Sequence, residues 1–535
     1  MSNRSCDVLL VGFESQENLG LRSLAAFLER EGIRVEIQAM QEATEQELLN
    51  RALREKPQVI GFSLIFQRML DRFADVISYL RENGVPGHFT MGGHFPTFAH
   101  DEILSLIPGL DSVIRNEGEE TLLELVRRAD TPNEWSSILG LSYRVADQIL
   151  VNPTRPLVEN LDSLPFPIRD PQSLTHRGID IRSITASRGC YYSCSFCSIS
   201  AFYRAPLGPP RRSRSPNNVV REMKSLHDDF GTRIFIFQDD DLFLQTPRHR
   251  DWLDQFLAEL RKAGLSNEIL WRVSCRIDDL DADYLQRMRD VGLASVYLGI
   301  ESASDSELRA MNKGYIASAV YEAVELLHSL RIPYEFGFML FTPDSTFETV
   351  TENMQFLRRM TDYGDALIHF CKMSPYAGTA IQQQLKVEGR LTGSLACPDY
   401  RLGDTKLDLL QMFFAQTFNF RNFSDAGLVE RLRFAKFDAN VLRQFGSGSE
   451  DADRYEERIK DLIHSCNESA IGTMSFALSF VDQNTEDNLI RQWRILESAR
   501  QHELSVEEQI SHDLDLTMAE FGSLTQETIG GLQIL

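Results

Sequence analysis

The sequence predicts an α/β protein with a doubly wound sheet, a second series of strand–helix units, and a mainly helical C-terminal region. Short apolar runs that end in glycine alternate with segments whose apolar residues recur at helical spacing, as is typical of parallel sheets. A proline-rich stretch separates the two α/β parts. From about residue 395 only helical spacing remains. We therefore expect domains at 1–140, 181–394 and 395–535, with a linker at 141–180.

Composition narrows the class of protein. The chain has 535 residues, enough for two to four domains, and a formal net charge of −23. Nucleic acid and anionic membranes both attract positive surface, so the charge argues against either as a partner. The sequence contains no apolar run of about 18 residues, so no membrane span is expected. The first residues lack the apolar core of a signal peptide, so we expect a reducing, cytoplasmic location.

The first part of the chain reads as alternating strands and helices. Leu19, Leu21, Leu24 and Leu28 recur at helical spacing, and Gly32 ends that helix. Ligands of doubly wound sheets bind beyond the carboxyl ends of the strands, where the glycine-rich turns of this part fall. The strands are expected at 8–11, 35–37, 59–63, 89–91 and 111–114.

Three cysteines are the most informative residues. Cys190, Cys194 and Cys197 form a CxxxCxxC spacing, which suits three irons of a four-iron cluster and leaves the fourth iron open to another ligand. A structural zinc site needs four ligands, and no further Cys or His follows nearby. Disulfides are disfavoured in a reducing compartment. The other five cysteines are scattered, and Cys275, Cys371, Cys397 and Cys466 are expected to be buried apolar residues.

The second part of the chain carries polar residues just after its strands. Asp239, Asp240 and Asp241 follow the strand at 233–237, and clustered carboxylates repel one another unless a cation is nearby. Capping of a helix is the plain alternative for any one of them. The arginines of 211–214 are expected to be solvated or paired with carboxylates rather than facing a substrate. Further strands are expected at 184–187, 270–274, 295–299, 335–340 and 366–370.

The segment from Ser187 through Cys190 to Phe196 and Cys197 resembles the cluster loop of radical S-adenosylmethionine (SAM) enzymes. The resemblance implies that SAM chelates the open iron and is cleaved to methionine and a 5′-deoxyadenosyl radical. It also implies a partial (β/α)6 barrel, open on one side, with the [4Fe–4S] cluster at its mouth. The residues that it implies for SAM are Phe196 near the adenine, Asp239 or Asp240 at the ammonium, Glu301 at the ribose or amino end, and Ser274.

The turns of the first part are similar to those of the cobalamin-binding domain in one class of radical SAM enzymes. The Asp-x-His-x-x-Gly motif that ligates cobalt elsewhere is absent, so a domain that has lost its cofactor is the alternative. His94 is expected to contact the loop or the corrinoid tail rather than cobalt. The residues that the resemblance implies for cobalamin are Leu19, Gly20, Ser63, Gly92, Gly93, His94, Glu117 and Gly118.

Together these resemblances imply a cobalamin-dependent radical SAM enzyme. We expect a C-methyltransferase that acts at an unactivated carbon of a small-molecule biosynthetic intermediate and takes electrons from a reductant such as flavodoxin or ferredoxin. Rearrangement, cyclisation or oxidoreduction without methyl transfer is the alternative on the same fold. A non-catalytic cobalamin or cluster sensor is a third. The helices of 395–535 are expected to close the barrel and shape the substrate pocket.

Overall fold

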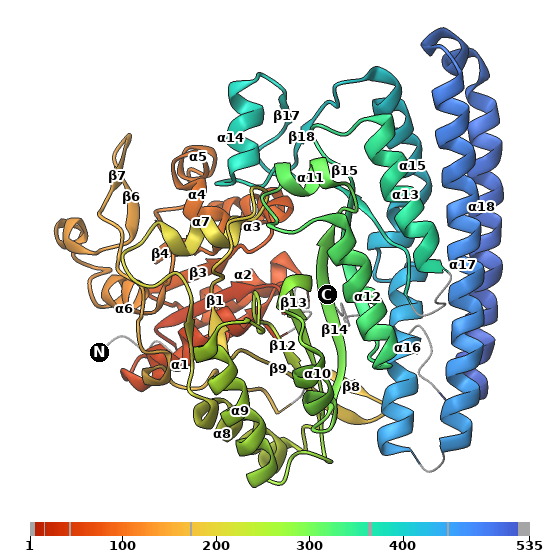
Figure 1. Ribbon diagram of the computed structural model, residues 1–535. Helices are drawn as coiled ribbons and strands as arrows, with labels where there is room; N and C mark the ends of the chain where they lie inside the picture. Colours follow the sequence, from red (N-terminus) through yellow and green to blue (C-terminus); the bar gives the residue numbers. More distant parts are fainter. Residues whose placement is uncertain are drawn as a thin grey trace. The chain divides into compact units, whose positions relative to one another are not determined.

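The chain forms two compact units, each built from separate stretches of sequence (Figure 1). The computed structural model describes residues 6–14, 17–41, 44–171, 174–361, 366–446 and 449–522. The first unit consists of Met1–Gln172, Ser183–Glu222 and Ser374–Tyr400, and the second of Ser173–Arg182, Met223–Met373 and Arg401–Leu535.

The first unit contains the predicted doubly wound sheet. Its strand order is β2-β1-β3-β4-β5-β6-β7, and the first five strands are parallel. The antiparallel hairpin β6–β7 extends the sheet beyond the five predicted strands. The strands are β1 (Val8–Gly12), β2 (Val35–Ala39), β3 (Val59–Ser63), β4 (His88–Gly92), β5 (Ser112–Ile114), β6 (Leu141–Val145) and β7 (Gln148–Val151). The helices are α1 (Leu19–Arg30), α2 (Glu45–Glu55), α3 (Leu70–Glu82), α4 (His94–Phe98), α5 (His100–Leu106) and α6 (Glu119–Arg127).

Both faces of this sheet are buried, as its continuous apolar strands predict. Leu9 and Val11 of β1 join the core formed with α2, α3 and α5. Val8 and Leu10 point to the opposite face and pack with α1 and α6. Alternate residues of one strand therefore serve two separate cores.

A late stretch of sequence completes the first unit. Ala377 and Ala396 lie in the same core as α2 and α3. The Gln67 side chain donates to the Leu395 carbonyl (2.6 Å) and accepts from the Ala377 amide (3.1 Å). This stretch carries α14 (Ala380–Val387) and the hairpin of β17 (Leu391–Gly393) and β18 (Pro398–Tyr400).

A second seven-stranded sheet has the order β16-β15-β14-β13-β12-β9-β8. From β12 to β16 neighbouring strands are parallel and follow the order of the chain, as a barrel-type winding requires. Its strands are β8 (Leu174–His176), β9 (Ile179–Ile184), β12 (Ile234–Phe237), β13 (Leu270–Cys275), β14 (Leu293–Glu301), β15 (Tyr334–Phe341) and β16 (Cys371–Lys372). The helices that follow them are α8 (Pro216–Phe230), α9 (Pro247–Lys262), α10 (Ala282–Arg289), α11 (Asp305–Ala310), α12 (Ala317–Ser329) and α13 (Phe347–Thr361).

Two details differ from the predicted barrel. Its first strand, β9, begins at Ile179 instead of 184, and the antiparallel strand β8 lies beside it at the edge. The strand predicted at 366–370 is wrong, because this segment is a loop and the strand is the short β16.

Helix side chains explain why 366–370 is not a strand. Asn467 accepts from the Ile368 amide (3.0 Å) and donates to the Ala366 carbonyl (2.8 Å). Arg421 donates to the Ile368 carbonyl (3.0 Å), and Asn422 donates to that of Phe370 (3.1 Å). The backbone groups that a neighbouring strand would pair are thus bonded by side chains.

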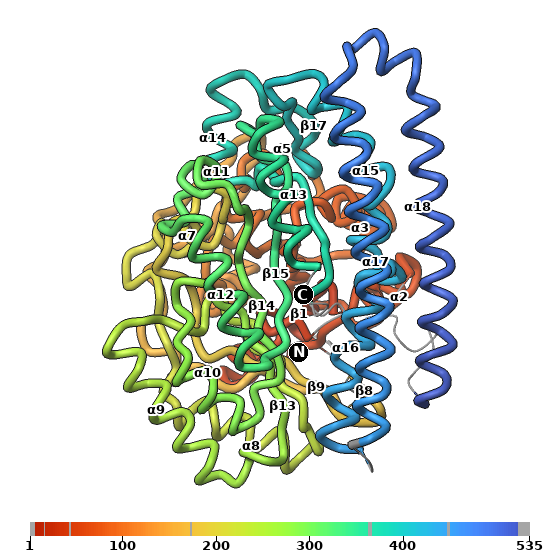
Figure 2. Tube along the Cα trace, turned by 45° about the vertical axis from the view of Figure 1, so that its right-hand side comes forward, coloured from red at the N-terminus to blue at the C-terminus, as the bar shows by residue number. Residues whose placement is uncertain are grey.

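The C-terminal region is helical, as predicted. It comprises α15 (Thr405–Phe423), α16 (Leu428–Phe445), α17 (Ser449–Gln483) and α18 (Glu486–Glu520). The last two, each 35 residues long, run side by side (Figure 2). No helix in the described ranges is long and apolar enough to cross a membrane.

Candidate active site

The carboxyl edge of the first sheet gathers the residues expected to contact cobalamin. Gly12, Ser63, Gly92 and Ile114 are in register across four neighbouring strands. Leu19 and Gly20 start α1, Gly93 and His94 start α4, and Glu117 and Gly118 precede α6. Three of the four residues in this row are Gly or Ser, so backbone is available to a flat ligand there, and the residues present fit a corrinoid.

Glycine is required at the turn after β4. Gly93 has φ +126°, and a Cβ there would lie 2.4 Å from the Leu64 carbonyl oxygen. Any larger residue would therefore force β4 and the β3 turn apart.

His94 packs against the helix that follows the cysteine loop. Its ring stacks on Phe202 of α7 (Ser198–Arg204), with centroids 4.1 Å apart and planes 6° from parallel. Tyr203 meets the same ring edge-on at 6.2 Å. Burial lowers the pKa of His94 to about 4, so the imidazole is neutral near pH 7. This aromatic packing is consistent with a role in the loop, as expected.

The three cysteines lie on a loop between two short strands. β10 (Ser187–Arg188) pairs antiparallel with β11 (Arg212–Ser213), and the loop between them carries Cys190, Cys194, Cys197 and α7. All three cysteines are half-buried, and none is in a disulfide. Phe196 is also half-buried. Three accessible thiols on one short loop suit a cluster with three protein ligands. Within the described ranges, no three His, Cys, Asp or Glu side chains are grouped as a metal would hold them, so the assignment of the cysteines stays a prediction.

Glu117 joins the first sheet to this loop. Its carboxylate accepts from Arg188 (3.0 Å), from Arg212 (2.9 Å) and from the Val158 amide (2.8 Å). Arg188 also donates to Glu119 (2.6 Å). Burial alone would raise the pKa of Glu117, but Arg188 and Arg212 together lower it below its usual value.

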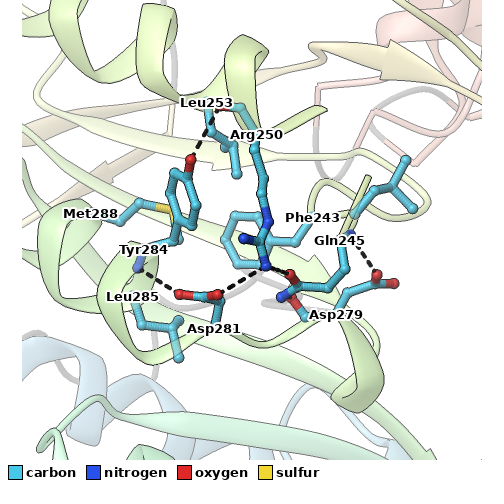
Figure 3. A pocket seen from close by; sticks show the side chains of 10 residues that line it. Phe243, Gln245, Arg250, Leu253, Asp279, Asp281, Tyr284, Leu285 and Met288 are labelled. Carbon is cyan, nitrogen blue, oxygen red and sulfur yellow. Dashed lines mark hydrogen bonds and ion pairs between the residues drawn. The ribbon is translucent and has the colours of Figure 1, made fainter. Parts of the chain in front are cut away.

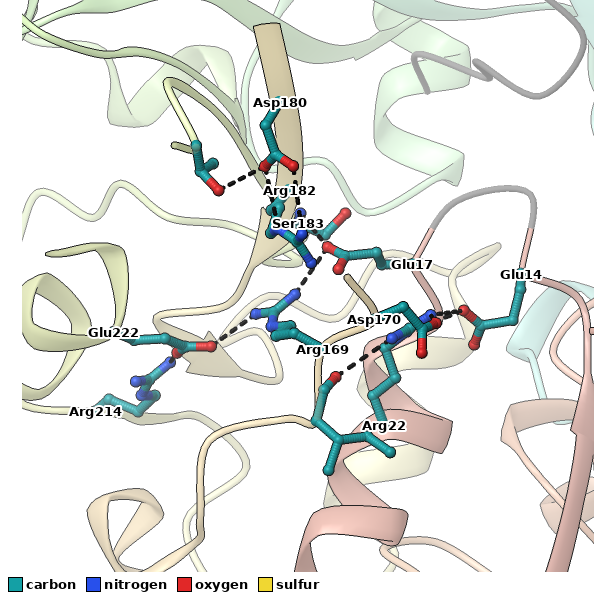
Figure 4. A network of polar contacts seen from close by, with 12 residues as sticks. Glu14, Glu17, Arg22, Arg169, Asp170, Asp180, Arg182, Ser183, Arg214 and Glu222 are labelled. Atoms are coloured by element: carbon teal, nitrogen blue, oxygen red, sulfur yellow. Dashed lines mark hydrogen bonds and ion pairs between the residues drawn. The ribbon is translucent and has the colours of Figure 1, made fainter. Parts of the chain in front are cut away.

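A second network of polar contacts reaches β9, the strand that precedes the cysteine loop (Figure 4). Glu17 accepts from the Ser183 amide (2.7 Å) and from Arg169 (2.8 Å). Arg169 also donates to Glu222 (2.7 Å), which pairs with Arg214 (2.6 Å). The expectation that the arginines of 211–214 pair with carboxylates is therefore confirmed for Arg212 and Arg214.

The second sheet has one polar, partly exposed face. Residues of β14 alternate between buried and partly exposed, and Tyr297, Gly299 and Glu301 are the partly exposed ones. Ser274 of β13 and Glu335 of β15 are in register with Tyr297 and are also partly exposed. Alternate residues share a face, so Ser274, Tyr297 and Gly299 lie on the same one. The Glu301 carboxylate also lies over this face, because Cβ atoms built on Gly299 and Gly337 would come within 3.0 Å and 3.4 Å of its oxygens.

The backbone turns Glu301 out of the regular strand. Its φ is +71°, and the register with β15 shifts between Gly299 and Glu301. A bulge of this kind redirects a side chain, and positive φ in a non-glycine residue is strained.

Two glycines make room for the Glu301 carboxylate. A Cβ on Gly299 would lie 3.0 Å from Glu301 Oε1, and one on Gly337 would lie 3.4 Å from Oε2 and 2.7 Å from the Tyr297 hydroxyl. Lys313 is 3% exposed and donates to the Gly299 carbonyl (2.9 Å) while its Nζ lies 3.4 Å from Glu301 Oε1. Sequence analysis missed Lys313, Tyr297 and Gly337, although the period-two spacing of 297, 299 and 301 indicated one face.

An ion-pair network lies on the same face. Glu335 accepts from Arg272 (3.0 Å), and Arg433 of α16 lies 3.8 Å away. Arg433 also donates to His369 (2.9 Å). Burial would raise the pKa of Glu335, but the two arginines lower it overall. Burial, then the nearby Glu301, raises the pKa of Cys371 to about 12, so that thiol keeps its proton.

The aspartates after β12 differ in exposure. Asp239 and Asp241 are 4% and 1% exposed, whereas Asp240 is exposed to solvent. Asp241, with burial, raises the pKa of the Cys275 thiol well above its usual value. Of the two aspartates expected to bind SAM, only Asp239 is held in the protein interior.

A small pocket lies between α9 and α10 (Figure 3). Its polar groups bond one another: Arg250 pairs with Asp281 (3.2 Å), and Gln245 donates to the Asp279 carbonyl (2.9 Å). None of the residues expected to bind a cofactor lines it.

Two family models match the chain. The model for the B12 binding domain matches residues 8–126, and that for the radical SAM superfamily matches residues 184–357. The first range covers the parallel strands of the first sheet, and the second covers the cysteine loop and β12 to β15.

Named relatives match about two thirds of the chain. An uncharacterized methyltransferase of Pyrococcus horikoshii is 28% identical over 370 residues, which are 68% of this chain and 77% of that protein. The hopanoid C-3 methylase of Methylococcus capsulatus is 25% identical over 398 residues, 72% of this chain and 71% of the methylase. The anaerobic magnesium-protoporphyrin IX monomethyl ester cyclase of Cereibacter sphaeroides is 26% identical over 361 residues, 65% of this chain. The matched part is only 57% of the cyclase's own length.

A solved structure shares the fold along almost the whole chain. It is the cobalamin-dependent S-adenosylmethionine radical enzyme OxsB with aqua-cobalamin and S-adenosylmethionine bound. The TM-score is 0.70 at 16% identity, over 99% of this chain and 84% of OxsB. The chain thus has the two domains of a cobalamin-dependent radical SAM enzyme, a B12-binding domain and a radical SAM domain, whose cofactors are cobalamin, a [4Fe–4S] cluster and SAM.

Proposed function

We propose that this enzyme is a C-methyltransferase acting at an unactivated carbon of a small-molecule biosynthetic intermediate. The observation that carries the proposal is the junction inside the first unit. There the edge that fits a corrinoid meets the cysteine loop through the His94–Phe202 stack and the Glu117–Arg188 ion pair. Methyl transfer by way of a radical needs both cofactors at one substrate, and two of the relatives are named as a methyltransferase and a methylase.

The proposed roles divide among three groups of residues. Bound SAM and cobalamin supply a 5′-deoxyadenosyl radical and a methyl group, respectively. Cys190, Cys194 and Cys197 would hold the cluster irons. Glu301, whose carboxylate lies against Gly299 and Gly337, would accept hydrogen bonds from SAM, and Ser274 would contact SAM from the neighbouring strand β13. Asp239 suits the SAM ammonium better than the exposed Asp240. Leu19, Gly20, Ser63, Gly92, Gly93, His94 and Gly118 would face the corrinoid.

The domain boundaries and partners belong to the same proposal. We propose functional domains at 1–140, 181–394 and 395–535. The predicted linker at 141–180 is not wholly a linker, because β6 and β7 at 141–151 belong to the first sheet and β9 begins at Ile179. Reduction of the cluster would draw electrons from a protein such as flavodoxin or ferredoxin, which places the reaction in the reducing cytoplasm. The charge of −23 favours a neutral or cationic substrate.

Anaerobic reconstitution with ferrous iron, sulfide and hydroxocobalamin tests the assignment. We expect about four irons per chain and a corrinoid spectrum that survives desalting. Cys194→Ala should abolish cleavage of SAM. Cys397 lies outside the loop and is exposed, so the prediction that it is buried is wrong, and Cys397→Ala should leave the cleavage unchanged. Cleavage that is indifferent to Cys194→Ala would overturn the cluster assignment.

The reaction products distinguish methyl transfer from rearrangement or cyclisation. A methyltransferase forms S-adenosylhomocysteine together with 5′-deoxyadenosine, because one SAM donates a methyl group and another yields the radical. Rearrangement or cyclisation, which the match to the cyclase favours, yields 5′-deoxyadenosine alone. A sensor would yield neither product.

A further inference from the structure

The base of the cysteine loop is closed by two strands whose facing side chains repel each other. In the β10–β11 ribbon, Ser187 faces Ser213 and Arg188 faces Arg212. Like charges directly opposite each other destabilise an antiparallel pair. Water screens this pair poorly, because the side chains of Arg188 and Arg212 are only 22% and 3% exposed. The ribbon has just two residues per strand, and beside it the Arg214 amide donates to the Ala186 carbonyl (2.8 Å).

One carboxylate bridges the two arginines. Glu117 Oε1 is 3.0 Å from Arg188 and 3.1 Å from Arg212, and its Oε2 is 2.9 Å from Arg212. The other terminal nitrogen of Arg188, Nη2, forms an ion pair with Glu119 (2.6 Å). The side chains of Glu117 and Glu119 are 7% and 5% exposed, so two buried negative charges balance the two positive ones.

The backbone of Val158 also holds the Glu117 carboxylate in place. The Val158 amide donates to Glu117 (2.8 Å), and Arg212 donates to the Val158 carbonyl (2.8 Å). Glu117, Arg212 and Val158 thus form a closed triangle, and three separate stretches of sequence meet at the carboxylate. With its lone pairs committed in this way, Glu117 is poorly placed to bond a corrinoid.

We propose that Glu117 is a positioning residue for the iron–sulfur cluster: by bridging Arg188 and Arg212 it closes the ribbon and sets the loop that carries the cysteines. This inference rests on the proposed function, since it takes Cys190, Cys194 and Cys197 to be the cluster ligands. It assigns the β5–α6 turn of the B12-binding domain a task in cluster assembly that does not involve the corrinoid. The cluster site then depends on a carboxylate that the B12-binding domain supplies.

Glu117→Gln tests the proposal, with Glu120→Gln as the matched control. Glu120 lies three residues away, with its side chain 57% exposed and paired to Arg155. Both variants and the wild type are reconstituted in full length with ferrous iron, sulfide and hydroxocobalamin. We expect E117Q to hold several-fold less iron than the wild type while retaining the same amount of corrinoid. Unchanged iron in E117Q, or loss of corrinoid with iron intact, would overturn the proposal.

A second measurement needs no cofactor. Arg204 is exposed within the loop, and trypsin can cleave after it. We expect this cleavage in the apo-protein to quicken by about tenfold in E117Q, because removing one partner of a buried ion pair strongly destabilises it. The Glu117→Gln/Arg212→Gln double variant, which removes the unbalanced charge as well, should return toward the wild-type rate and iron content. Additive losses in the double variant would contradict the bridge.

The outcomes distinguish a failure of the positioning role of Glu117 from a failure of the proposed radical SAM function. If wild-type protein takes up no iron, the radical SAM function itself fails. If the wild type and E117Q take up equal iron, only the positioning role fails. Should E117Q not fold, Arg188→Lys is measured instead. Lysine keeps the positive charge but lacks the second terminal nitrogen that bonds Glu119. Lower iron with retained corrinoid supports the proposal in that variant, and unchanged iron overturns it.

Discussion

The imidazole of His94 and the ring of Phe202 lie face to face, 4.1 Å apart, although 108 residues of sequence separate them. One belongs to the turn after β4 and the other to the helix after the cysteine loop. The packing of these two rings is the closest aromatic contact described between the two segments.

Phe202→Ala should destabilise the protein. Phe202 is 4% exposed and also contacts Tyr203 and Phe98, so its removal leaves a cavity that costs about 3–5 kcal/mol. Urea unfolding of the apo-protein measures this loss. Phe423→Ala, at a position 50% exposed, is the control and should change the free energy of unfolding by less than about 0.5 kcal/mol. Equal losses in both variants would contradict the packing role.

His94→Phe should leave the corrinoid spectrum unchanged. A phenyl ring keeps the stack on Phe202 but has no nitrogen to offer to cobalt. If His94 ligated cobalt, the visible absorption of bound hydroxocobalamin would shift in the variant. Spectra of the wild type and H94F, taken after desalting, decide between the two roles.

Variants around Glu301 should weaken SAM binding. Lys313→Met removes the cation beside the carboxylate, and Gly337→Ala places a Cβ 2.7 Å from the Tyr297 hydroxyl. Each change should raise the Kd for SAM by about tenfold, which corresponds to about 1.4 kcal/mol. Equilibrium binding to the reconstituted enzyme measures it, with Lys262→Met at a 73% exposed position as the control. Wild-type affinity in both variants would remove Glu301 from the SAM site.

Asn467→Leu should destabilise the segment at 366–370. Asn467 is fully buried and bonds the Ile368 amide and the Ala366 carbonyl. Each buried backbone group left without a partner costs about 1–3 kcal/mol. Hydrogen exchange at Ile368 should therefore quicken. Gln509→Leu, on the exposed side of α18, serves for comparison and should leave that exchange rate unchanged.

Glu507 should make stability depend on pH. Burial raises its pKa from 4.5 to about 7, although Arg421 opposes the shift. Between these two values the folded chain holds a proton that the unfolded chain has released, so stability is complete below about pH 4.5 and is lost as the pH rises to about 7. Glu507→Gln stays neutral throughout.

The advantage of E507Q over the wild type should therefore grow between pH 5 and pH 8, by about 2 kcal/mol. Urea unfolding at several pH values measures the difference. Glu508→Gln, at an exposed neighbouring position, should show no such trend. A constant difference between E507Q and the wild type would show that Glu507 titrates alike in both states.

Much of the fold could be predicted because buried parallel strands read as continuous apolar runs. β1 and β3 are such runs, and glycine or serine ends each of them. β8 was missed because Leu174–His176 is short and two of its three residues are polar. The segment 366–370 misled because its apolar side chains are buried as in a strand, while helix side chains bond its backbone.

Only some residues of the candidate site could be predicted from the sequence. The cysteines and Glu301 could be named from local motifs. Lys313, Phe202 and Arg212 could not, because each acts on a residue that only the folded chain brings near. Glu117 was expected at a corrinoid, and only its three partners reveal that its carboxylate is already engaged.

The divided sequence of the first unit has a consequence for how the protein is made. A nascent chain that has emerged as far as Met373 has all seven strands of the first sheet but lacks Ala377, Ala396 and the backbone partners of Gln67. Synthesis of the intervening 150 or so residues takes roughly 10–30 s. Throughout that interval the Gln67 amide and part of the core around α3 face water. The sheet that leaves the ribosome first must therefore wait for the second to be translated before its own folding can be completed.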